Sequence, residues 1–318
     1  VMYEKPVLVL APSTLTLQWQ IEMKDRLGIP SAVWSSRDKV WLGVEGQSLS
    51  QKGDYRAIGR CPCRIAIVST GLVMHQRNSD TGCFEKEAGC LLNNKYGVIV
   101  LDEAHRARRR GGLGSRSSTP NNLLAFMTLA AKCTRHMILG TATPIQTDVR
   151  ELWDLLNILS TDAEFVLGDS QSPWRDCEAA ASVVTGKRSP QTAEEGWEWL
   201  RNPLPPEKEH MLVGLLRDNL AIGPTKHDCH YPYDDLTPVV RNWIPECLDG
   251  EFFRGCNPVL RHVVLRKRAE LEEAGLLERV GVNTHPNRSM RDSYRHRFVG
   301  LGIDTNTPFQ VAYEKAEE

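Results

Sequence analysis

Short apolar runs alternate with amphipathic stretches through the first 160 residues of the chain. Four of these runs are compact, as expected for strands that are buried on both faces of a sheet. They occupy residues 6–11, 64–68, 98–101 and 136–139. Strands that alternate with helices predict a parallel sheet flanked by helices on both faces, which is an α/β fold with three layers.

The first predicted helix follows the first strand. Its apolar positions recur every fourth residue, at Leu15, Trp19, Met23 and Leu27. This spacing predicts a buried stripe on one helix face, with Ser13 or Thr14 as the N-terminal cap. Because Trp19 lies in the stripe, we expect it to pack in the core rather than to contact nucleic acid.

The strand pattern stops near residue 160. A helix is predicted near 120–132, and Leu152, Leu155, Leu156 and Leu159 predict another by their spacing. Further helical stretches are expected near 192–201, 207–220 and 257–275. We therefore divide the chain into a sheet domain (1–160), a mostly helical insertion (161–256) and a basic helical block (257–318).

Composition and charge exclude several classes of protein. The 318 residues include 39 Lys+Arg and 40 Asp+Glu, a formal net charge of −1, with 41% hydrophobic and 25% charged residues. These values exclude a collagenous, coiled-coil or wholly disordered chain. No apolar run approaches the roughly 20 residues that cross a bilayer, so no membrane partner is expected. The near-zero charge also argues against binding nucleic acid by bulk charge alone.

Nine cysteines without a secretory signal predict reduced thiols and a cytoplasmic protein. Cysteine and histidine gather in two places: Cys61, Cys63, Cys83 and Cys90, and His227, Cys229 and His230. In the first group, Cys61 and Cys63 have one residue between them, which differs from the paired two-residue spacing that is usual in zinc sites. We therefore expect loop and core thiols, and no zinc.

The strongest candidate chemistry follows the third strand, where Asp102 and Glu103 stand at its carboxyl end. Ligands of open α/β sheets bind at this end of the strands. One carboxylate could hold Mg²⁺ through water, and the other could orient and deprotonate an attacking water. The simpler alternative is a strand that ends in a solvated acidic turn. The fourth strand also ends in polar side chains, Thr141 and Thr143, whose hydroxyls could relay hydrogen bonds from such a site.

These segments together resemble the first RecA-like lobe of superfamily-two helicases, and within them the Swi/Snf-type ATP-dependent translocases. Asp102-Glu103-Ala104-His105 is similar to motif II, the DEAH box, and Thr141-Ala142-Thr143 to motif III. Pro12, Ser13 and Gln18-Trp19 resemble motif Ia, and Ser69-Thr70-Gly71 stands where motif Ib would lie. Residues 151–159 resemble a helix that marks the Swi/Snf branch, and 261–268 a basic block of the same family.

The resemblance implies roles for these residues and two cofactors, ATP and Mg²⁺. Asp102 would hold Mg²⁺ through water and Glu103 would activate the attacking water. His105 would link the nucleotide state to motif III, where Thr141, Thr143 and Gln146 would pass it on. The residues expected to follow the phosphate backbone of double-stranded DNA are Pro12, Ser13, Gln18, Ser69, Thr70, Gly71, Arg266, Lys267 and Arg268.

Basic residues elsewhere leave several interpretations open. Arg106, Arg108, Arg109 and Arg110 crowd the loop after motif II. Residues 261–297 contain nine Lys+Arg against five Asp+Glu, a surplus of four. Either group could bind phosphates, form a solvated face, or contact another lobe of the protein.

The chain also departs from the family's pattern. It contains no Gly-x-x-x-x-Gly-Lys-Ser/Thr loop. In the family this loop precedes motif Ia and a second lobe follows, so we expect a fragment of a longer protein that is inactive alone. The alternative is a complete protein with a processed start. Ala142-Thr143-Pro144 replaces the family's usual Gly-Thr-Pro and is closer to bacterial and phage branches, which suggests RNA polymerase or phage-defence proteins as partners.

The leading hypothesis is therefore an ATP-dependent translocase on double-stranded DNA. Two alternatives remain at this point. The chain could be a non-catalytic module derived from such a motor that docks DNA or protein, or part of a helicase of the same superfamily that separates strands.

Overall fold

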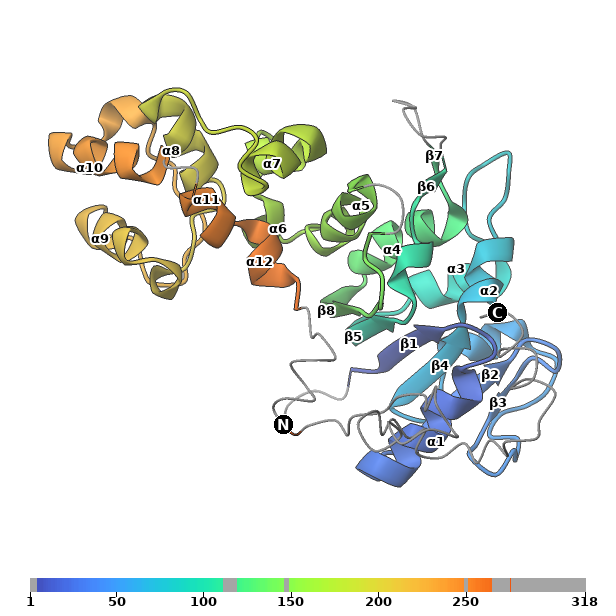
Figure 1. Ribbon diagram of the computed structural model, residues 1–318. Helices are drawn as coiled ribbons and strands as arrows, with labels where there is room; N and C mark the ends of the chain where they lie inside the picture. Colours follow the sequence, from blue (N-terminus) through green and yellow to red (C-terminus); the bar gives the residue numbers. More distant parts are fainter. Residues whose placement is uncertain (1–4, 111–118, 146–148, 249–250, 265–274, 276–318) are drawn as a thin grey trace, which may run out of the picture. The chain divides into compact units, whose positions relative to one another are not determined.

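The computed structural model describes residues 5–110, 119–145, 149–248, 251–264 and 275 (Figure 1). The chain divides into two compact units, Val1–His262 and Val263–Glu318. The elements described below belong to the first unit. Within the described residues, no helix is both long enough and apolar enough to cross a membrane.

A six-stranded sheet forms the centre of the first half of the chain. Its strands are β1 (Val7–Ala11), β2 (Ser31–Ser35), β3 (Val40–Leu42), β4 (Ile65–Ser69), β5 (Tyr96–Leu101) and β8 (Thr134–Leu139). They lie in the order β3-β2-β4-β1-β5-β8. All neighbours pair in parallel except β2 and β3, which are antiparallel. The four predicted strands are confirmed, and β2 and β3 are additional.

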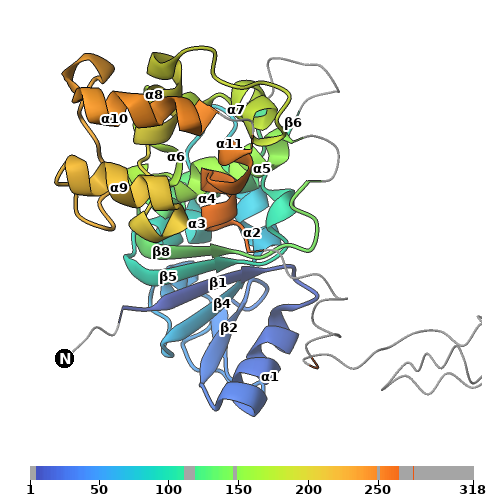
Figure 2. The same cartoon turned by 60° about the vertical axis from the view of Figure 1, so that its left-hand side comes forward.

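Helices cover both faces of this sheet (Figure 2). They are α1 (Thr16–Leu27), α2 (Thr70–His75), α3 (Lys86–Leu92), α4 (Asn122–Ala131) and α5 (Arg150–Leu159). Alternate residues of β1 point to opposite faces: Leu8 and Leu10 join a core with α2 to α5, whereas Val9 joins a smaller core against α1. The predicted α/β class with three layers is confirmed.

The first helix differs in detail from its prediction. Neither Ser13 nor Thr14 caps α1, whose N-cap residue is Leu15 with no side-chain hydrogen bond. Leu27 is 62% exposed, although the stripe predicted burial. The buried positions include Gln20, whose Nε2 donates to the carbonyl oxygens of Ser31 (3.0 Å) and Leu42 (3.1 Å). A polar side chain therefore joins α1 to β2 and β3, because its amide satisfies two strand carbonyls.

Beyond α5 the described residues form helices and loops only. The helices are α6 (Glu164–Leu167), α7 (Cys177–Val184), α8 (Ala193–Arg201), α9 (Met211–Asn219), α10 (Pro238–Trp243), α11 (Phe252–Gly255) and α12 (Pro258–His262). Short 3-10 helices occur both before and after α5, at Tyr55–Gly59, Ala104–Arg106, Pro173–Arg175, Glu207–Glu209, Tyr233–Asp235 and Ile244–Leu248. Before α4, strands β6 (Arg109–Arg110) and β7 (Thr119–Pro120) pair as a two-stranded antiparallel ribbon. Most of the helix predicted over 257–275 lies outside the described residues.

Aromatic residues form the core of this helical region. Trp174 packs edge-on against Trp199, with ring centroids 4.8 Å apart, and its indole Nε1 donates to the Trp199 carbonyl oxygen at 2.8 Å. In the same way Trp153 of α5 donates to the Trp174 carbonyl oxygen at 2.8 Å. The Trp153 bond connects the helical region directly to the sheet domain, whereas the Trp174–Trp199 bond lies within the helical region.

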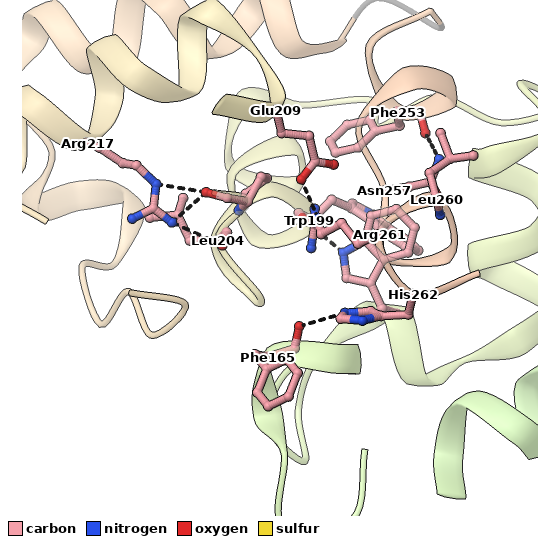
Figure 3. Close-up of polar contacts among 12 residues, drawn as sticks. Phe165, Trp199, Leu204, Glu209, Arg217, Phe253, Asn257, Leu260, Arg261 and His262 are labelled. Carbon is pink, nitrogen blue, oxygen red and sulfur yellow. Dashed lines mark hydrogen bonds and ion pairs between the residues drawn. The ribbon is translucent and has the colours of Figure 1, made fainter. Parts of the chain in front are cut away.

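Charged side chains hold the end of the helical region in place (Figure 3). The buried Arg217 guanidinium donates to carbonyl oxygens of the loops on either side of α9, including that of Leu204 at 3.2 Å. Arg261 of α12 forms an ion pair with Glu209 at 2.5 Å. His262 Nε2 lies 3.3 Å from the carbonyl oxygen of Phe165 in α6. The C-terminal end of α12 is therefore held by two contacts, one with Glu209 and one with α6.

Candidate active site

The carboxyl ends of neighbouring parallel strands meet at one edge of the sheet. Leu10 of β1 and Leu139 of β8 are both register partners of Leu101 in β5. The backbone continues this alignment past the strands, because Asp102 N–H donates to the Leu10 carbonyl and Ala104 N–H to the Gly140 carbonyl, each at 2.8 Å. The residues that follow β1, β5 and β8 therefore form one site.

Asp102 is held there by two N–H donors. Its Oδ1 accepts from the Glu103 backbone N–H at 2.9 Å, and its Oδ2 accepts from the indole Nε1 of Trp19 at 2.8 Å. An ionised carboxylate offers about four acceptor positions, so two remain for other ligands. Asp102 is half-buried, which leaves these positions open to a bound group.

Glu103 has a strained backbone. Its φ of 53° and ψ of 47° lie in the left-handed region, which non-glycine residues seldom adopt. Such strain is typical of functional sites. The turn leads directly into the 3-10 helix Ala104–Arg106, and the Glu103 side chain remains 37% exposed. The carboxylate is therefore available to a ligand at the strand end.

His105 connects the two strand ends. Its Nδ1 lies 3.1 Å from Glu103 Oε2 and 3.1 Å from Thr141 Oγ1. A ring nitrogen carries at most one proton, so these two oxygens compete for the same Nδ1 position. Thr141 Oγ1 also accepts from the Thr143 backbone N–H at 3.1 Å. Polar contacts thus run from the carboxylate after β5 to the turn after β8.

The segments predicted as motifs Ia and Ib reach the same edge, because Ala11 of β1 is the register partner of Ser69 in β4. Pro12 and Ser13 follow β1, and Ser13 is exposed. Gln18 is exposed on α1.

The start of α2 orders the second of these segments. Ser69 Oγ caps the helix by accepting from Gly71 N–H at 3.2 Å. Thr70 is buried, and its hydroxyl has no hydrogen-bond partner in the described part of the chain. Because Thr70 is buried and Gly71 has no side chain, the half-buried Ser69 is the side chain of this segment that a ligand could reach. The remaining predicted residues, Gln146, Arg266, Lys267 and Arg268, lie outside the described residues.

Two of the arginines after motif II have partners on α5. Arg108 pairs with Glu151 at 3.1 Å and Arg109 pairs with Asp154 at 3.0 Å. Burial raises the pKa of Asp154 above its ordinary value, and the hydrogen bonds from Arg109 offset part of that rise. Sequence reasoning missed these pairs, although acidic residues on the facing side of the predicted leucine helix were a signal for them.

The donor set suits magnesium better than zinc. No group of three or more His, Cys, Asp or Glu side chains gathers within the described residues. Mg²⁺ in nucleotide sites commonly takes one or two carboxylates together with phosphate oxygens and waters. Asp102, with its free acceptor positions, fits that role. Burial also raises the pKa of Cys61 to about 12, which disfavours the thiolate that zinc requires.

Comparison with known proteins finds relatives among helicases and DNA repair proteins. Helicase SWR1 of Eremothecium gossypii is 28% identical over 155 residues, which are 48% of this chain and 8% of that protein. The uncharacterized ATP-dependent helicase YqhH of Bacillus subtilis is 26% identical over 155 residues, 49% of this chain and 21% of its own. The DNA repair and recombination protein RAD54-like of Mus musculus is 27% identical over 201 residues, 60% of this chain and 23% of its own.

The chain thus spans less than a quarter of the length of these relatives. The family description that matches is the SNF2-related domain, over residues 1–179. This match covers more than half of the 318 residues and includes β1 to β8 with the site at their carboxyl ends. The chain belongs to the SNF2-related domain family.

Proposed function

We propose that this chain is the first motor lobe of an ATP-dependent translocase that moves along double-stranded DNA. The observation that carries the proposal is the linked set of side chains at the sheet edge, where His105 contacts both Glu103 and Thr141. Similarity to ATP-dependent helicases and to DNA repair proteins supports the same class of reaction.

Asp102 and Glu103 divide the chemistry in this proposal. Asp102 would hold Mg²⁺ through bound water, and the ion would supply neutralisation of charge on the nucleotide phosphates. Glu103 accepts a proton from the attacking water, for which an exposed, ionised carboxylate close to the phosphates is suited. The N–H of His105 orients the Glu103 carboxylate, because Nδ1 lies 3.1 Å from Oε2.

The same histidine connects hydrolysis to motif III. Its Nδ1 is equally close to Thr141 Oγ1, so any movement of the Glu103 carboxylate on hydrolysis changes the hydrogen bonds of Thr141. Thr143 is linked to Thr141 because its backbone N–H donates to Thr141 Oγ1. We assign Thr141, Thr143 and Gln146 to coupling on this basis and on the family resemblance.

The phosphate-binding loop is supplied by a further strand in this proposal. Strand β8 pairs with β5 and with no other strand among the described residues. Ile138 of β8 is 57% exposed, and its neighbours Arg135 and His136 are exposed as well. The outer edge of such a strand presents backbone N–H and C=O groups that can pair with another strand. We propose that a strand elsewhere in the longer protein pairs there and that the chain alone does not hydrolyse ATP.

DNA contacts come from the edge where β1 and β4 end. Ser13 and Gln18 are exposed beside this edge, and backbone amides and hydroxyls can follow phosphates without reading bases. Arg266, Lys267 and Arg268, which lie outside the described residues, are assigned to DNA binding in this proposal on the family resemblance alone. Balanced net charge is compatible with such a short track, because binding does not depend on bulk charge.

Triplex displacement tests the proposal in the full-length protein. A translocase on duplex DNA removes a third strand in an ATP-dependent manner without separating the duplex. Glu103→Gln should abolish displacement, and Glu45→Gln, an exposed carboxylate outside the site, should not. Separation of the duplex strands would favour the strand-separating helicase instead, and triplex displacement by the Glu103→Gln variant would contradict the assignment of Glu103.

A further inference from the structure

The indole of Trp19 contacts the candidate site, which the sequence did not predict. The sequence predicted a core residue, and the ring does pack beside the small core of Val9, Val33, Ile65 and Ile67. However, Trp19 is only half-buried, and its Nε1 donates to Asp102 Oδ2 at 2.8 Å across 83 residues of sequence. The side chain therefore has a packing end and a polar end.

The fold gives this contact little freedom. The Trp19 ring is fixed by packing between α1 and the sheet, and α1 is joined to β2 and β3 through Gln20. On the other side, the Asp102 backbone N–H is bonded to Leu10 of β1. A rigid ring and a rigid strand end thus meet through one hydrogen bond.

We propose that Trp19 is a positioning residue for Asp102, selecting the carboxylate orientation in which Asp102 holds the metal–nucleotide complex. An indole N–H can only donate, so Trp19 acts as a donor to the Asp102 carboxylate. It occupies one acceptor position of Oδ2, while the Glu103 N–H occupies one of Oδ1. The remaining positions are thereby directed away from both donors. This inference rests on the proposed function of Asp102.

Partners that orient a ligand side chain usually matter 10- to 100-fold for metal affinity or activity. For Trp19→Phe, which keeps a packing ring and removes the donor, we expect the Mg²⁺ concentration for half-maximal ATPase of the full-length protein to rise by roughly tenfold or more. Trp41→Phe is the matched control, because it removes an indole hydrogen bond of the same length, 2.8 Å to the Ala57 carbonyl, on the same sheet away from Asp102.

A second readout needs neither metal nor turnover. In ¹⁵N-labelled protein, Trp19→Phe identifies the Trp19 indole N–H signal by its disappearance. Asp102→Asn, which removes the carboxylate charge, should shift that signal and leave the indole signals of the other tryptophans unchanged. An unshifted Trp19 signal would overturn the contact and the inference with it.

The two readouts separate the inference from the proposed function. A shifted Trp19 signal with an unchanged Mg²⁺ requirement in Trp19→Phe would overturn the positioning role, as would an equal change in Trp41→Phe. In contrast, normal hydrolysis by Glu103→Gln would overturn the proposed function and leave the Trp19–Asp102 contact intact.

Discussion

Glu87 provides a quantitative test of the sheet domain, because its side chain is fully buried yet ionised. It forms an ion pair with Lys39, and its Oε2 accepts from Gln76 Nε2 at 2.7 Å. Burial alone raises the pKa of Glu87, but hydrogen bonds from Lys39, its own backbone N–H and Gln76 outweigh burial and lower the pKa below 4.5. Glu87→Gln removes this charge with almost no change in volume.

The expected cost follows from the exposure of both partners. Breaking a fully buried ion pair from one side costs about 3–5 kcal/mol, because the other charge is left unpaired. The Lys39 side chain is 33% exposed, so water can solvate its ammonium in part. We therefore expect Glu87→Gln to lower the free energy of unfolding by about 2 kcal/mol at pH 7. Glu45→Gln at an exposed position should change it by less than about 0.5 kcal/mol.

Urea unfolding measured between pH 8 and pH 4 tests how this loss of unfolding free energy depends on pH. The pKa of Glu87 is lowered in the folded protein, so its stabilisation is complete above the ordinary value of 4.5 and is lost as the pH falls through the folded value. The difference between wild type and Glu87→Gln should be constant above pH 5 and should shrink below 4.5. A difference no larger than that of Glu45→Gln, or one that grows in acid, would refute the reasoning.

Two other substitutions probe contacts between elements. Thr141→Val removes the hydroxyl that His105 contacts, and it should lower DNA-stimulated ATPase of the full-length protein about tenfold while ATP binding persists. Thr128→Val, which removes a hydroxyl bonded within α4, is its control, and equal losses would argue against coupling. Trp153→Phe leaves the buried Trp174 carbonyl without its donor and should cost about 1–3 kcal/mol in urea unfolding. An unchanged midpoint would show that this bond does not stabilise the joint between sheet and helical regions.

The central strands could be predicted because each is a compact apolar run, and all four are present as β1, β4, β5 and β8. In contrast, β3 has only three residues, and in β2 only three apolar residues lie between Ser31 and Ser35, so the pattern did not identify either strand. The prediction of the buried stripe on α1 was partly wrong for a different reason. Gln20 is buried because it meets two strand carbonyls, a tertiary contact that no local pattern contains.

The candidate site, like the fold, could be predicted from the sequence only in part. The positions of Asp102 and Thr141 at strand ends follow from the order of elements, and the parallel sheet brings those ends together. The left-handed backbone of Glu103 and the Trp19 contact do not follow from it, because both depend on how separate elements pack. The arginines after β5 were open to several interpretations, and two of them pair with acidic residues of α5.

The most direct test of the central claim is single-turnover ATP hydrolysis by full-length Glu103→Gln with saturating DNA, measured beside its ATP affinity. If Glu103 activates the attacking water, hydrolysis should be lost while ATP binding stays within a few-fold of wild type. Hydrolysis at the wild-type rate would contradict the assignment of the site at the carboxyl end of β5.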